Sequence, residues 1–156
     1  MPDLFTKTLC AGVISGMRSM AGLALVSNSL AKSQSNLLQD SKLNWVGSPK
    51  VALVMKFLAA GEIVGDKLPM TPSRIAPGPL FGRLLFGGFS CAALWISEGK
   101  RARTGVLLGA VSAAAGAYTF YYLRRSAGKA SGIPDPWIGL LEDILAYGVG
   151  ASIIKR

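Results

Sequence analysis

The chain has 156 residues, of which 51% are hydrophobic and only 16% are charged, and it contains no histidine. Soluble domains carry about 25% charged residues, so this composition favours a membrane protein over a soluble one. The net charge of +9 would suggest nucleic-acid binding in a soluble protein. Here the basic residues flank the apolar segments, as membrane anchors do, so we expect a lipid bilayer and no nucleic acid as partner.

Five apolar segments follow one another along the chain, at residues 9–31, 51–68, 80–97, 104–123 and 137–154. A helix needs roughly 20 residues to cross about 30 Å of hydrocarbon, and each segment is close to that length. We therefore expect residues 1–156 to form a single all-α transmembrane domain of about five spans, with its termini on opposite sides of the bilayer. Its expected location is the cell (inner) membrane.

The first segment is longer than the core of a secretory signal peptide and contains Arg18. We expect it to remain as an uncleaved first membrane helix. A targeting peptide and a re-entrant segment are the alternatives.

Glycines recur four residues apart in three of the segments, a spacing that lets membrane helices approach closely. We expect these glycine-rich faces to pack helices within the chain, with contact between two copies of the chain as the alternative. The first and fourth segments also share the pattern Gly-Val-x-x-Gly, and in a five-span topology they would run in opposite directions, as in an inverted repeat. The glycine pairs are Gly12 and Gly16, Gly61 and Gly65, and Gly105 and Gly109.

Four charged residues, Arg18, Glu62, Glu142 and Asp143, lie inside the apolar segments. A charge at membrane depth is costly, and it usually pairs with another charge or lines a polar path. At about 1.5 Å per residue, Arg18, Glu62 and Glu142 lie about 13, 9 and 8 Å from the same membrane face. We expect these four residues and Asp66 to form an ion, proton or substrate site, with Arg18 as counter-ion to Glu62 or Glu142. The alternative is a structural ion pair that fixes helix register.

The connections on this side of the membrane are rich in proline, which cannot continue a helix and biases the preceding residue to extended conformations. We expect a stiff hairpin between the second and third segments that acts as an ordered lid. Asp135 and Pro136 fit the N-cap and first position of the fifth helix. The residues expected to gate or shape the entrance are Lys67, Pro69, Pro72, Arg74, Arg83, Pro134 and Asp135.

Four motifs are distributed along the chain: GMRSMAG at 16–22, GEIVGDKLPMTPSR at 61–74, GVLLGAVSAAAGAYTFYYLRR at 105–125 and GIPDPWIGLLEDILA at 132–146. The pattern resembles the bacterial small membrane proteins grouped as domain of unknown function 4126. The resemblance implies a shared membrane fold but no activity, and the Ser-rich connection at 27–48 departs from it. It marks as signature positions only Arg18, Glu62, Asp66, Lys67, Arg74, Glu142 and Asp143.

Three classes of function remain open, and we expect a small transporter or channel for an ion or solute. A non-catalytic structural or assembly subunit of a membrane complex, binding partners or a second copy through its GxxxG faces, is the alternative. An enzyme would need a nucleophile with an activating base, whereas this chain offers only a carboxylate pair. We therefore expect no catalytic residue and no cofactor. Cys10 and Cys91 are interpreted as buried apolar residues, so no metal site is expected.

Overall fold

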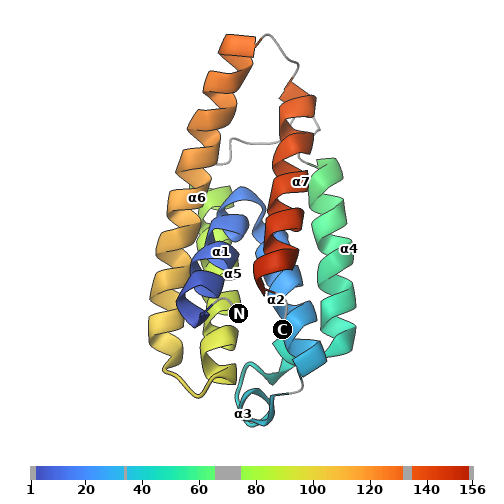
Figure 1. Ribbon diagram of the computed structural model, residues 1–156, viewed down its shortest axis with the longest axis vertical. Helices are drawn as coiled ribbons and strands as arrows, with labels where there is room; N and C mark the ends of the chain where they lie inside the picture. The colour runs from blue at the N-terminus through green and yellow to red at the C-terminus, as the bar shows by residue number, and fades with distance from the viewer. Residues whose placement is uncertain (1–2, 34, 66–74, 132–134, 155–156) are drawn as a thin grey trace.

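The computed structural model describes the chain apart from residues 1–2, 34, 66–74, 132–134 and 155–156 (Figure 1). The described residues form α-helices joined by short connections, which confirms the all-α class. In chain order the elements are α1 (Leu4–Met17), α2 (Ser19–Ser33), α3 (Asn36–Gln39), the 3-10 helix η1 (Asn44–Gly47), α4 (Pro49–Gly65), α5 (Pro77–Ser97), α6 (Ala102–Ser131) and α7 (Asp135–Ile154).

Three of these helices are long and apolar enough to cross a membrane, namely Pro77–Ser97, Ala102–Lys129 and Trp137–Ile154. Large apolar side chains are exposed on α4, α6 and α7, with Phe57 70%, Leu107 67% and Leu141 58% exposed. Soluble monomers rarely expose such extensive apolar surface, because its contact with water is unfavourable. These features indicate an integral membrane protein, while the predicted number of five spans is not confirmed.

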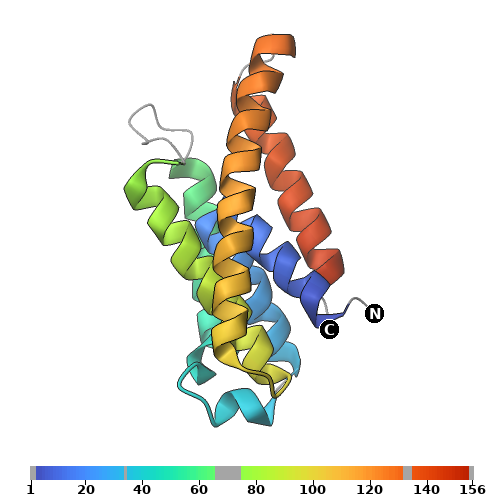
Figure 2. The same ribbon diagram turned by 90° about the vertical axis from the view of Figure 1, so that its left-hand side faces the viewer.

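The first apolar segment is not one helix, so the prediction of a single membrane helix over residues 9–31 is wrong. The chain breaks at Arg18, whose backbone is extended with φ −142° and ψ 114°. The two resulting helices, α1 with 14 residues and α2 with 15, form a V whose apex is the break (Figures 1 and 2). Each arm is shorter than the roughly 20 residues that a straight crossing requires.

The V returns the chain towards the end of the molecule from which it started. The beginning of α1 and the end of α7 consequently lie near one another in both views (Figures 1 and 2). The Ser29 hydroxyl donates a hydrogen bond of 2.8 Å to the carbonyl oxygen of Ile154, which ties α2 to the end of α7. The expectation that the termini lie on opposite sides was therefore wrong, because it assumed a straight first span.

Helix α1 packs against α6 with almost no space between the backbones. A Cβ atom added to Gly12 would lie 2.5 Å from the Cβ of Ser112, and one added to Gly16 would overlap the carbonyl oxygen of Ala113. The contacts advance in the same direction along both helices, so α1 and α6 run parallel. The predicted opposite directions of an inverted repeat are wrong for this pair.

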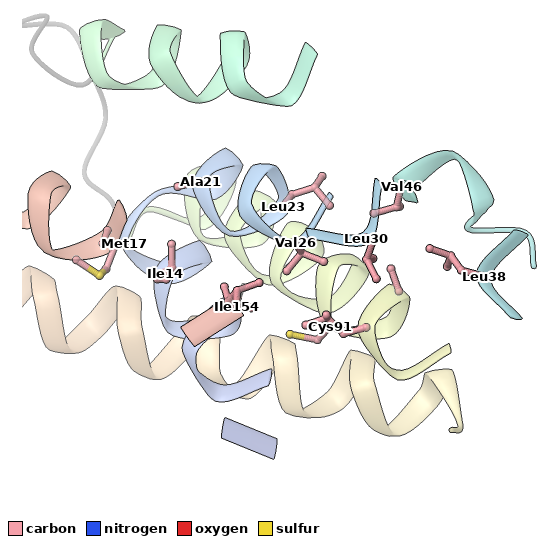
Figure 3. Packing of buried hydrophobic residues seen from close by; sticks show 14 residues of the cluster. Ile14, Met17, Ala21, Leu23, Val26, Leu30, Leu38, Val46, Cys91 and Ile154 are labelled. Carbon is pink, nitrogen blue, oxygen red and sulfur yellow. The ribbon is translucent and has the colours of Figure 1, made fainter. Parts of the chain in front are cut away.

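Buried apolar side chains from α1, α2, α5 and α7 form the core inside the V (Figure 3). Ile14, Val26, Cys91 and Ile154 all belong to it and are at most 3% exposed. Leu38 and Val46, from the polar connection between α2 and α4, extend this core at one end of the molecule. The core therefore holds the two arms of the V between the longer helices.

The contact at Gly16 leads to a matched pair of substitutions. We expect Gly16→Ala to lower the free energy of unfolding by about 1–3 kcal/mol, the usual cost of overpacking. Gly61→Ala is the control, because an added Cβ there meets nothing within 4 Å. Chemical unfolding of both variants in detergent micelles measures the difference, and equal stability would contradict the close packing of α1 on α6.

Candidate functional site

Arg18 lies at the apex of the V, and its guanidinium group reaches two other helices. Its Nε donates to Asp143 Oδ1 at 2.6 Å and its Nη2 donates to Asp143 Oδ2 at 3.0 Å, which makes a two-pronged ion pair with α7. Its Nη1 donates to the backbone carbonyl of Glu62 in the last turn of α4 at 3.3 Å. Arg18 and Asp143 are 3% and 5% exposed, so the pair is shielded from solvent. The expected counter-ion was Glu62 or Glu142, whereas the structure pairs Arg18 with Asp143.

The side chain of Glu62 binds the beginning of α2. Its Oε1 accepts a hydrogen bond of 2.8 Å from the Ser19 backbone N–H, and its Oε2 accepts one of 2.9 Å from the Met20 N–H. The first N–H groups of a helix have no partner within the helix and carry partial positive charge. Glu62 therefore acts as an N-terminal cap supplied by a different helix.

Arg83 binds the other side of the break. Its Nη1 donates to the carbonyl oxygens of Gly16 at 2.8 Å and Met17 at 2.7 Å, the last two residues of α1. A cation is favourable at a helix C-terminus, where carbonyl groups lack intrahelical partners. Arg83 was expected in a gating loop, but it lies within α5 and is only 5% exposed. Its observed role is to cap α1.

Arg18, Glu62, Arg83 and Asp143 are called the junction cluster below. The four side chains come from the break between α1 and α2 and from α4, α5 and α7. Unsatisfied backbone groups at membrane depth cost several kcal/mol each, so an interrupted helix requires partners of this kind. The cluster holds two positive and two negative groups. It therefore satisfies the break without leaving a net charge among its own members.

Glu142 belongs to a different contact. Its Oε2 lies 3.7 Å from Arg124 Nη1, which links α7 to the extended end of α6. The Arg124 guanidinium passes close to the backbone of Gly139, where an added Cβ would lie 3.3 Å from Nη2. The adjacent acids Glu142 and Asp143 on α7 thus pair with two different arginines, Arg124 on α6 and Arg18 at the break. The sequence placed both acids at the correct level but did not distinguish their partners.

Several residues expected at the entrance lie outside the described part of the chain. Pro77 and Pro79 are in the first turn of α5, so the part of the expected connection that contains them is helical. Asp135 begins α7, in agreement with the expected helix start. The interpretation of this connection as a lid stays a prediction, because most of its residues are not among those that the structure describes. The expected site and entrance residues concerned are Asp66, Lys67, Pro69, Pro72, Arg74 and Pro134.

Two cavities lie along α2 and α7, and the first is lined by Ile63, the residue after Glu62 of the junction cluster. The first has a volume of about 260 Å³, lies between α2, α4 and α7, and includes Tyr147, one turn beyond Asp143. The second, of about 110 Å³, continues between α2 and α7 towards Lys32. Both cavities are lined by Leu25 and Asn28, so they are neighbours. Sequence reasoning missed Asn28 and Tyr147, although polar groups within apolar segments were the available signal.

A third hollow, of about 500 Å³, lies between α1, α6 and α7 and has an almost wholly apolar lining. Leu9, Val13, Phe120 and Val149 contribute to it, and no charged side chain does. Within the described ranges, no three His, Cys, Asp or Glu residues lie together as a candidate metal site. Another hollow, of about 400 Å³, lies beside α3 and η1 and is lined in part by Ser35, Gln39, Asn44 and Ser48.

Comparisons with known proteins add no assignment. No family model matches the chain, and neither a curated protein nor a solved structure matches it. The resemblance to domain of unknown function 4126 therefore stays a prediction.

The Arg18–Asp143 pair allows a double-mutant cycle. We expect Asp143→Leu alone to destabilise the fold by about 3–5 kcal/mol, because it leaves a buried guanidinium without its carboxylate. Arg18→Met combined with Asp143→Leu should cost clearly less than the sum of the single changes, since the buried charges are removed together. Unfolding in detergent measures each variant, with exposed Asp40→Leu as a control expected within about 0.5 kcal/mol of wild type. Additive single effects would contradict the pairing.

Proposed function

We propose that this protein is a small transporter or channel for an ion or small solute in the cell (inner) membrane. The observation that carries the proposal is the broken helix at Arg18, around which charged groups from α4, α5 and α7 meet. Transporters commonly place their binding site where a membrane helix is interrupted, because the exposed helix ends bind charged groups. Charged residues at membrane depth likewise mark ion and substrate pathways more often than they serve packing alone.

The two cavities supply a route beside this break. The first is lined by Ile63 and Tyr147, next to Glu62 and one turn beyond Asp143, and the second extends along α2 to Lys32, close to the end of α7. Asn28 lines both and can offer hydrogen bonds through its amide group. Pathways of this kind need polar groups at intervals, since a solute that leaves water must exchange its hydration for protein contacts.

The second candidate is a non-catalytic assembly subunit. It is favoured by the mutual pairing within the junction cluster, which accounts for those charges without any solute. The partner surface would be the face of α4 that carries Gly61 and Gly65, where an added Cβ meets nothing within 4 Å. A second copy packing there through the GxxxG spacing is the homo-oligomer proposed for this role. Membership in domain of unknown function 4126 is compatible with either candidate.

Flux through reconstituted liposomes tests the transport proposal. We expect wild-type protein to pass at least one of protons, K⁺ and Cl⁻, and Glu62→Gln to reduce that flux at least about tenfold, the effect of about 1.4 kcal/mol. Gln keeps one acceptor oxygen for the first N–H groups of α2 but removes the charge, and size-exclusion profiles check that this variant is folded. Glu98→Gln, at the other end of α5 from Arg83, is the matched control and should leave flux unchanged. No flux with any ion would favour the assembly role.

The proposed orientation follows from the distribution of basic residues. Among the described residues, the connections and helix ends at one end of the bundle carry more basic side chains than those at the other. The first group is Lys32, Lys42, Lys50, Lys100, Arg101 and Arg103, and the second is Arg124, Arg125 and Lys129. An excess of basic residues marks the cytoplasmic side. We propose that the end bearing Lys100 is cytoplasmic.

Cysteine labelling in intact cells tests this orientation. In a background with Cys10→Ala and Cys91→Ala, we expect Arg125→Cys to react with a membrane-impermeant maleimide and Lys100→Cys to react only after the cells are opened. Both positions are exposed, so accessibility within the fold does not limit either reaction. The reverse labelling pattern would contradict the orientation.

A further inference from the structure

We infer that the solute of the proposed pathway is a small anion. This inference rests on the proposed function and concerns the two cavities along α2 and α7. Their lining residues include the basic side chains of Lys56 and Lys32. Among the described residues that line either cavity, none is acidic.

The charges that face these cavities from each neighbouring element have the same sign. Lys56 is contributed by α4 and Lys32 by α2, while α7 contributes Tyr147 and, further along, Gly150, Ala151 and Ile154, none of which is ionised at neutral pH. A cation in this space would meet two ammonium groups and no carboxylate. Lys56 and Lys32 are both exposed side chains. Basic residues along a pathway favour anions, because opposite charges attract.

The junction cluster, whose Glu62 precedes the cavity-lining Ile63 on α4, also binds a carboxylate. The first N–H groups of α2 already bind one carboxylate, that of Glu62, at 2.8 and 2.9 Å. Arg18 donates to the Glu62 carbonyl and to Asp143 beside it. Both acids of the cluster, Glu62 and Asp143, are thus engaged by peptide and guanidinium donors. An anion moving through the cavities passes the Lys56 and Lys32 ammonium groups and the Asn28 amide.

The cavity volumes limit the size of the solute. The larger space is about 260 Å³ and the smaller about 110 Å³, both below the roughly 300–1,000 Å³ of sites for drug-sized ligands. They fit a monovalent inorganic anion or a short carboxylate rather than a nucleotide or a sugar phosphate. Chloride and acetate are therefore the appropriate probes.

The test is ion-specific flux in liposomes that contain the full-length protein. Chloride influx is followed with an enclosed chloride-quenched dye, acetate influx with an enclosed pH dye, and K⁺ flux with a K⁺-sensitive dye in the same preparation. We expect flux of chloride or acetate that exceeds K⁺ flux. We expect Lys56→Gln to reduce the anion flux about fivefold, the effect of about 1 kcal/mol for one basic residue at a membrane site.

Lys50→Gln is the matched control, because Lys50 is exposed on the same helix and lines neither cavity. It should leave the flux unchanged. Asn28→Leu provides a second variant without any change in charge, and it should lower anion flux by removing the amide shared by both cavities. Size-exclusion profiles in detergent check that each variant is folded.

The outcomes separate this inference from the proposed function. K⁺ or proton flux without anion flux would support transport and overturn the anion assignment. Anion flux that Lys50→Gln lowers as much as Lys56→Gln would also overturn it, since general surface charge would then explain the preference. Absence of any flux would overturn both proposals.

Discussion

The structure depends on how an interrupted helix is satisfied inside an apolar bundle. At the break after Met17, Arg83 binds the carbonyl groups that end α1 and Glu62 binds the N–H groups that begin α2. Each charge has the sign that the helix end favours, so both complement the helix dipoles while replacing lost backbone hydrogen bonds. Without these partners, the orphaned peptide groups would favour one continuous helix, and the V, the nearby termini and the cavities along α2 would all be lost.

The charges at membrane depth carry two kinds of interaction. Glu62 and Arg83 bind backbone and define the shape of the chain, whereas the Arg18–Asp143 pair fastens the apex of the V to α7. Buried ion pairs are weak sources of stability, but breaking one is costly, so they fix which elements meet. Tyr147, one turn beyond Asp143 on α7, lines the cavity that Ile63 of α4 and Asn28 of α2 also line. The charges of the junction cluster therefore have structural roles whether or not the proposed pathway exists.

The sequence predicted the depth of the charged residues along the helices better than it predicted which side chains pair with one another. Helical rise alone placed Arg18, Glu62 and the acids of the last segment at a common depth, and the structure brings Arg18 together with Glu62 and Asp143. The break itself carried no local signal, because no proline or glycine stands at residues 17–19 and GMRSMAG fits a helix. The role of Arg83 could not be predicted either. Its partners, the carbonyl oxygens of Gly16 and Met17, are available only because α1 ends at the break. The choice between Glu142 and Asp143 depends on helix rotation, which tertiary packing decides.

The most direct measurement of the central claim is the distance between the two ends of the first apolar segment. Spin labels are attached at Phe5→Cys and Lys32→Cys in protein that also carries Cys10→Ala and Cys91→Ala. Pulsed electron–electron double resonance in lipid nanodiscs then measures the distance between the two labels. Excess unlabelled protein suppresses signals between different copies of the chain. A continuous helix would separate these positions by about 40 Å, at about 1.5 Å per residue. The broken helix predicts a single, much shorter distance, which Glu62→Ala should broaden. A narrow distribution of label-to-label distances at about 40 Å would contradict the break at Arg18 and the site built around it.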